Sequence, residues 1–310
     1  MLAHLTVPAR LVLASSLLIT SLAFAETPDE SITAEMNSSN ASVSPYARTE
    51  TDSEYLFLPA RGTNAVQINY SQSKTPTFIT TDAETGSAIA ADSRSTDYDF
   101  HFVRNISTAT YLNIDAGFAS QEISGGELAL KSQGLKDVGF GLTGINMFMN
   151  WNLVYGGQFT FSPGGHRDAQ ANGLTGNQFS GGTSISPFIA FETTSHTAVW
   201  GMRAAAYYGS GVQSTFDQPS RLLSGSVFYE IPVIRTARVG FSAGAGRDPN
   251  GAASSGSLSS VFNNYSAGAY AKVQLPAQSD VVVRIRAANV DRENSSVTTT
   301  EASLGLRKTL

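Results

Sequence analysis

The chain has 310 residues, a formal net charge of −5 and no cysteine, so it can form neither disulfides nor thiolate-bound metal sites. The acidity comes from one short stretch. Residues 26–60 hold seven acidic residues and one basic residue, whereas the chain from residue 61 onward holds 18 of each. With no basic patch in the sequence, we expect no nucleic-acid partner.

Residues 1–25 have the pattern of a secretory signal peptide. Arg10 precedes an apolar run at residues 11–22, and Ala23-Phe24-Ala25 supplies a small-x-small cleavage site. The run is shorter than the ~20 apolar residues that a membrane-spanning helix requires. We therefore expect an exported protein whose mature chain begins at Glu26.

Residues 26–60 form a leader rich in Ser, Thr, Asn and acidic residues, and its first twenty residues carry few large apolar side chains. Such a composition favours a flexible segment over a folded one. The alternative is a segment that plugs the rest of the protein or contacts it. Residues 55–59 are more apolar, and we expect them to pack at the mouth of the following domain.

Residues 61–310, which follow the expected signal peptide and leader, form the third region of the chain. They contain twelve segments in which apolar and polar residues alternate. Alternation with period two places apolar side chains on one face of a strand. About a dozen such segments of roughly ten residues are typical of a transmembrane barrel, so we predict a single antiparallel β-barrel of about 12 strands. The strands are expected at residues 65–73, 96–105, 110–121, 137–149, 152–162, 182–192, 197–209, 222–231, 237–247, 265–275, 280–289 and 299–310.

The connections between these segments alternate between long and short. Outer-membrane barrels have short periplasmic turns and longer external loops. The alternation therefore predicts a protein of the outer membrane of a Gram-negative bacterium, with membrane lipid and the barrel-assembly machinery as partners. The expected external loops are residues 74–95, 122–136, 163–181, 210–221 and 248–264.

The two faces of the strands differ in charge. Tyr98, Phe100 and Phe102 share one face of their segment, and acidic residues with one histidine share the other. An arginine on the lipid face would cost about 2–4 kcal/mol at the bilayer midplane, so the charged face is expected to line the lumen. The predicted pore-lining residues are Asp97, Asp99, His101, Asp115, Arg203, Arg238, Lys272, Arg284, Arg286, Glu301 and Arg307.

The sequence contains no pattern typical of an enzyme site. None of its four histidines has the His-x-Ser spacing of lipid-cleaving barrels. His166 and Asp168 lie close together in an expected loop, where a solvated pair is the simpler interpretation. His101 lies near Asp97 and Asp99, which favours a hydrogen-bond network in a pore wall. We expect no enzyme activity, no cofactor and no metal.

The stretch Gly-Leu-Lys-Asp-Val-Gly-Phe-Gly-Leu at residues 134–142 resembles a phrase of outer-membrane barrels related to the phenol-degradation meta-pathway (MetA-type) protein. The number of strands and the Leu-Gly-Leu-Arg sequence at residues 304–307 are similar too. That resemblance implies a channel or transporter for small organic compounds.

Two functions remain open at this point, besides a barrel enzyme and a soluble secreted β protein. The first is a passive outer-membrane channel for small organic solutes, which could be apolar or aromatic. The second is a closed structural or surface-interaction barrel that presents adhesive external loops at residues 74–95, 163–181 and 248–264. A twelve-stranded cylinder lies between packed eight-stranded barrels and open sixteen-stranded porins, so its width does not separate the two functions.

Overall fold

The structure is a computed structural model, which describes residues 51, 53–82, 87–125, 128–161, 182–193, 198–211, 221–247, 263–276, 278–292 and 295–310. The expected signal peptide, the leader up to residue 50 and the His166–Asp168 pair lie outside the described residues. No helix in the described ranges is both long enough and apolar enough to cross a membrane.

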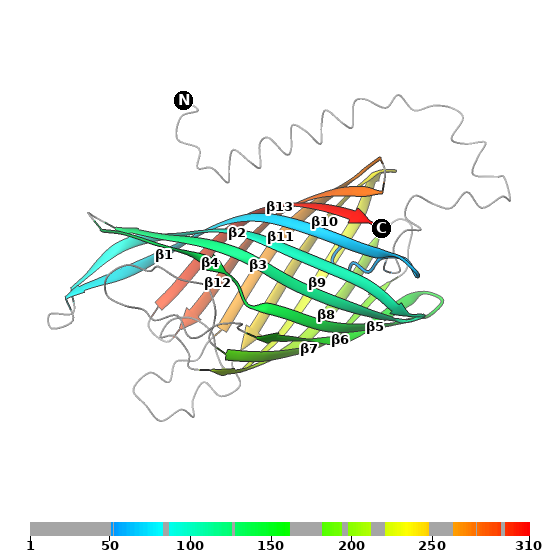
Figure 1. Ribbon diagram of the computed structural model, residues 1–310, viewed down its shortest axis with the longest axis horizontal. Coiled ribbons are helices and arrows are strands. Elements are labelled where there is room, and N and C mark those ends of the chain that lie inside the picture. Colours follow the sequence, from blue (N-terminus) through cyan, green and yellow to red (C-terminus); the bar gives the residue numbers. More distant parts are fainter. Residues whose placement is uncertain are drawn as a thin grey trace.

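The described residues form thirteen antiparallel strands (Figure 1). Both β4 and β5 pair with β3, so together they make one barrel strand that is interrupted at residues 136–137. Pairing of β1 with β13 and of β2 with β3 closes the cylinder, which confirms the predicted twelve-stranded barrel. The strands are β1 (Asn64–Asp82), β2 (Ser87–Ser107), β3 (Thr110–Gly125), β4 (Leu128–Leu135), β5 (Val138–Met147), β6 (Trp151–Phe161), β7 (Gly182–Thr193), β8 (Val199–Gly211), β9 (Arg221–Ile234), β10 (Ala237–Arg247), β11 (Asn263–Leu275), β12 (Ser279–Arg292) and β13 (Ser295–Thr309).

Two of the predicted loops are wrong. Residues 74–95 are mostly strand, because β1 and β2 stay paired in register from Asn64–Arg104 to Thr80–Ala88. Residues 122–136 are mostly strand as well, because β3 pairs with β4. Figure 1 shows these hairpins projecting past the other strands on the left. The apolar alternation that marks a membrane strand weakens in these projections while the backbone hydrogen bonds continue, which is why sequence reasoning ended the strands too early. Residues 162–181 and 248–262 lie outside the described part of the chain.

The outer surface of the barrel is apolar, as the alternation predicts. In β2, Tyr98 and Phe100 are exposed on the outside, and the same holds for Trp200 and Met202 in β8. In lipid, only helices and closed barrels give every backbone group a hydrogen-bond partner. This barrel is closed, and its exposed apolar side chains form a belt that can face lipid. The belt includes Phe118, Phe140, Leu142, Tyr155, Phe159, Ile185, Ile189, Val227, Tyr229, Phe241, Leu304 and Leu306.

Candidate functional site: a lumen occupied by the N-terminal segment

Residues 51 and 53–60, here called the N-terminal segment, lie inside the barrel at its short-turn end. The segment leads directly into the seam that closes the barrel, where Asn64 and Leu310 exchange backbone hydrogen bonds of 3.1 and 2.8 Å. Most of its side chains are buried. Residues 55–59 were expected to pack at the barrel mouth. In the structure the segment reaches further and lies inside the lumen.

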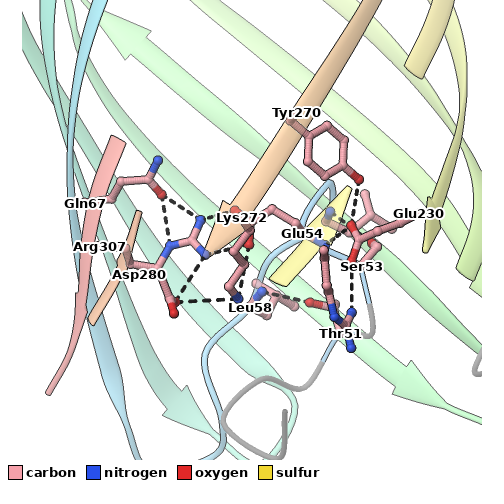
Figure 2. A network of polar contacts seen from close by, with 12 residues as sticks. Thr51, Ser53, Glu54, Leu58, Gln67, Glu230, Tyr270, Lys272, Asp280 and Arg307 are labelled. Carbon is pink, nitrogen blue, oxygen red and sulfur yellow. Dashed lines mark hydrogen bonds and ion pairs between the residues drawn. The ribbon is translucent and has the colours of Figure 1, made fainter. Parts of the chain in front are cut away.

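Glu54 anchors the segment to the last three strands of the barrel. Arg307 of β13 donates to both carboxylate oxygens, from Nη1 to Oε2 at 2.7 Å and from Nη2 to Oε1. Arg284 Nη2 lies 3.4 Å from Oε1, and Lys272 Nζ lies 3.5 Å from Oε2. A bidentate arginine–carboxylate pair is a strong and geometrically specific contact. Figure 2 shows Arg307 and Lys272 on one side of the segment, and Glu230 with Tyr270 on the other.

The surroundings of Glu54 keep its carboxylate ionised. Burial by itself raises the pKa of this carboxyl, but the nearby charges of Arg307 and Lys272 outweigh burial and lower the pKa from 4.5 to about 2. The carboxylate therefore carries its charge at neutral pH, where it can offset the three cations that face it.

Two further carboxylates from the barrel wall bind the backbone of the segment. Glu192 of β7 accepts a hydrogen bond of 3.1 Å from Ser53 N, and Glu230 of β9 accepts one of 2.8 Å from Glu54 N. Glu230 also accepts hydrogen bonds from Tyr270 Oη at 2.7 Å and Arg238 Nη1 at 2.9 Å. Buried carboxylates with several donors are satisfied groups, so these contacts hold the segment in one position.

The opposite side of the segment packs against apolar residues that face inward. Leu56 and Leu58 are buried in one cluster with side chains of β2, β3 and β5–β9: Val103, Tyr111, Ile145, Val154, Ala190, Val199 and Phe228. Tyr55 stacks on Phe228 with ring centroids 4.7 Å apart, and its hydroxyl lies 2.8 Å from Ser226 Oγ. The segment thus has one charged side and one apolar side, and the barrel interior matches both.

A cavity of about 580 Å³ remains in the lumen beside the segment. Tyr55 and Phe57 of the segment line it, together with Phe188 of β7. Of the predicted pore-lining residues, six line this cavity: Asp99, His101, Asp115, Arg203, Arg284 and Arg307. The cavity wall therefore combines aromatic rings with charges of both signs.

The predicted pore-lining residues form three separate groups of contacts on the lumen side. In the first, Lys136 Nζ lies 3.3 Å from Asp97 Oδ1 and 2.7 Å from Asp99 Oδ1. In the second, His101 contacts Asp115, which also accepts a hydrogen bond of 2.8 Å from Gln158 Nε2. The third is the cluster around Glu54 and Glu230, which includes Arg238, Lys272, Arg284 and Arg307.

The remaining predicted residues stand apart from these groups. Arg286 and Glu301 lie opposite each other in the register of β12 and β13. The guanidinium of Arg203 lies 4.5 Å from the centre of the Phe188 ring, and no carboxylate in the described ranges forms an ion pair with it. Arg203 is therefore a cation on the cavity wall whose charge is not offset by a direct partner.

Sequence reasoning missed several residues of this site. Glu192, Glu230 and Tyr270 lie on the inward faces of predicted strands, so the alternation that selected Arg203 and Arg238 would have found them too. Lys136 falls at the end of the expected loop at residues 122–136. Glu54 falls in the expected leader, and its only sequence signal is the apolar and aromatic residues that follow it at positions 55–58.

Within the described ranges, no group of three or more His, Cys, Asp or Glu residues is placed to hold a metal ion. A closed twelve-stranded barrel with an apolar outer belt is the architecture of outer-membrane β-barrel proteins, and this chain is a protein of the Gram-negative outer membrane.

Solved structures of similar fold are outer-membrane barrels. The COG4313 outer membrane channel from Pseudomonas putida F1 aligns with a TM-score of 0.59 and 12% identity, over 84% of this chain and 100% of that chain. The translocator domain of the autotransporter NalP from Neisseria meningitidis aligns with a TM-score of 0.46 and 13% identity, over 79% of this chain and 88% of that one. The sequence matches no protein-family model and no curated protein.

Proposed function

We propose that the protein is a passive channel for small organic solutes in the outer membrane. The observation that carries the proposal is the lumen cavity of about 580 Å³, a volume within the range of small-molecule binding sites. Tyr55, Phe57 and Phe188 offer apolar ring surface there, and Arg203 offers a cation that has no ion-pair partner among the residues that the structure describes. The rest of the lining is mostly polar, with Asn113, Thr143 and Gln158 beside the charged groups, so the cavity suits small organic solutes that combine an aromatic ring with polar groups. The Pseudomonas putida barrel of similar fold is itself an outer membrane channel, which agrees with the proposal.

The test is single-channel conductance of the refolded chain, residues 26–310, in a planar bilayer. Discrete conductance steps are expected, with a shift of ion selectivity toward cations in Arg203→Gln because that variant removes the unpaired positive charge from the lumen. The matched control is Arg247→Gln, which removes an exposed arginine at the end of β10 and should leave selectivity unchanged. Absence of conductance from a folded, inserted protein would contradict the proposal.

A closed barrel that acts through its external surface is the second candidate. The observation in its favour is the N-terminal segment, whose buried contacts with Glu192, Glu230 and Arg307 narrow the path along the barrel axis. If the barrel is closed, the wild type should show no conductance in a planar bilayer. Its interaction through the external surface should persist when the lumen is blocked. The conductance measurement therefore separates the two candidates.

A further inference from the structure

The strands beside Arg203 place no charge against its guanidinium. Its partners in the strand register are Ala190 of β7 and Ser226 of β9, and neither carries a charge. Glu192, two residues along β7 from Ala190, accepts hydrogen bonds from the backbone N–H and the hydroxyl of Ser53. Among the residues that the structure describes, the positive charge of Arg203 is therefore not compensated.

The guanidinium of Arg203 has one covered face and an unsatisfied edge. Its central carbon lies 4.5 Å from the centre of the Phe188 ring, so the ring covers one face of the planar group. Nε, at the edge of that plane, is buried and has no hydrogen-bond acceptor in the described part of the chain. An arginine donates in its own plane, where two parallel donors match the two oxygens of a carboxylate. A solute with a carboxylate would bring the acceptors that the wall does not supply.

Two hydroxyl groups beside Arg203 offer one more donor. Tyr55 Oη lies 2.8 Å from Ser226 Oγ, and Ser226 is opposite Arg203 in the register of β8 and β9. A single hydrogen bond between two hydroxyls uses one of their two protons. The second proton has no acceptor among the described contacts, so it can be donated to the same carboxylate.

Other charges of the cavity wall are already matched. Three acidic residues that line the cavity each contact a basic side chain of the barrel. These pairs are Glu54–Arg307, Asp99–Lys136 and Asp115–His101. An anion that enters the cavity therefore finds its complement at Arg203.

We propose that Arg203 is the recognition site for the carboxylate of a small aromatic acid, whose ring packs against Tyr55 and Phe188 in the lumen cavity. The inference rests on the proposed channel function and names its substrate class, monocarboxylates with one aromatic ring. A cavity of about 580 Å³ has room for such a solute. The carboxylate satisfies the donors of Arg203, and the aromatic side chains cover the apolar ring.

Calorimetric titration of the refolded chain, residues 26–310 in detergent, with benzoate tests the site. Arg203→Gln should weaken benzoate binding by about 10- to 100-fold, the range that corresponds to hydrogen bonds with a charged group. Arg203→Lys keeps the charge but lacks the planar pair of donors, so it should recover only part of the loss. The control is Arg247→Gln, which removes an exposed arginine outside the cavity and should bind benzoate as the wild type does.

Reversal potentials in a planar bilayer test whether the same site selects solutes during passage. Sodium chloride is placed on one side of the bilayer, and sodium benzoate or sodium acetate on the other. An unselective pore would pass the smaller acetate more readily, whereas the wild type should prefer benzoate. Phe188→Leu should remove this preference and leave acetate permeability unchanged. The matched control is Phe241→Leu, which replaces an exposed ring on the outer surface of β10 and should keep the preference.

The two measurements separate this inference from the channel function. A conducting wild type that does not bind benzoate, or that prefers acetate, would overturn the inference and leave the channel function standing. Binding at the wild-type affinity in Arg203→Gln would overturn it as well. A wild type that binds benzoate without conducting would support the site and contradict the channel, and one that does neither would contradict both. Heat-dependent gel mobility establishes that each compared variant is a closed barrel.

Discussion

At the scale of single residues, the lumen is organised by Glu54. One carboxylate faces Arg307, Arg284 and Lys272, which come from three different strands. A buried ion pair gains little over an apolar replacement of the whole pair, but removal of one partner leaves buried charge uncompensated and costs about 3–5 kcal/mol. Glu54 thus contributes chiefly to the position of the N-terminal segment and less to the stability of the barrel.

Replacement of Glu54 by glutamine should release the segment. We expect Glu54→Gln to weaken docking by about 3–5 kcal/mol, since Asp280, which lies near Lys272 and Arg307, then remains as the one carboxylate that the described contacts place against these three cations. The measurements are single-channel conductance, which should rise, and proteolysis within residues 51–60, which should accelerate. The control is Glu122→Gln, at an exposed position of β3. Conductance and proteolysis at wild-type levels in Glu54→Gln would show that the apolar contacts of Leu56 and Leu58, with the backbone contacts to Glu192 and Glu230, hold the segment without the Glu54 carboxylate.

Docking of the segment should depend on pH only under strongly acidic conditions. The pKa of Glu54 falls from 4.5 to about 2 on docking, so the stabilisation is complete above pH 4.5 and is lost as the pH falls toward 2. We expect constant conductance between pH 7 and pH 5 and opening below about pH 3. In Glu54→Gln this transition should be absent, even though Glu230 remains in place. A transition near neutral pH in the wild type would contradict the assignment.

At the scale of elements, neighbouring strands interlock through tyrosine and glycine. Gly240 of β10 lies directly opposite Tyr270 of β11, and a Cβ at Gly240 would come within 2.1 Å of the tyrosine ring. The ring therefore lies over the glycine, which places its hydroxyl 2.7 Å from the buried carboxylate of Glu230. Because Gly240 of β10 has no side chain, the Tyr270 ring can lie over it and donate to Glu230 of β9. Glu230 in turn accepts a hydrogen bond from the backbone of the N-terminal segment.

Gly240→Ala should displace Tyr270 and break this contact. Loss of a donor to buried Glu230 costs about 1–3 kcal/mol, and we expect a decrease of that size in the free energy of unfolding measured in urea. Gly225→Ala is the control, because a Cβ there has almost empty surroundings and should change stability little. Tyr270→Phe should reproduce the loss from Gly240→Ala. If Tyr270→Phe has no effect, the hydroxyl contact contributes nothing measurable.

The strands of the barrel could be predicted from sequence because lipid imposes a simple rule on them. Phe100 outside and His101 inside follow from period two alone, and the same rule placed Arg203 and Arg307 on the lumen face. The rule fails where lipid is absent. Inside the barrel, Val103, Ile145 and Val199 face inward although they are apolar, because Leu56 and Leu58 cover them. Their partner is a segment some fifty to 140 residues away, and no local pattern records that contact.

At the scale of the whole molecule, the barrel is a closed ladder that does not need the N-terminal segment. Every strand pairing lies between Asn64 and Thr309, and the closing pair β1–β13 is continuous from Ala65–Thr309 to Lys74–Thr300. The segment contributes side-chain contacts inside this cylinder and only isolated backbone hydrogen bonds to it. Barrel closure and lumen closure are therefore separable properties of the chain.

Deletion of residues 26–60 should leave a folded barrel with an open lumen. We expect the shortened chain to keep the heat-dependent gel mobility of a closed barrel, to conduct more than the full chain and to prefer anions. The preference follows because Lys272, Arg284 and Arg307 then face water without Glu54. Loss of the heat-dependent mobility shift would show that the segment is required for barrel closure.

The partners of Glu54 also determine an order of assembly. Its carboxylate binds residues of β11, β12 and β13, and its backbone binds Glu230 of β9, so its binding site does not exist until almost the entire chain is in place. The segment is synthesised before the barrel, yet it gains its contacts after the last strand has joined the first. Docking of Glu54 is thus a marker of completed assembly, because only a fully formed cylinder presents the three cations together.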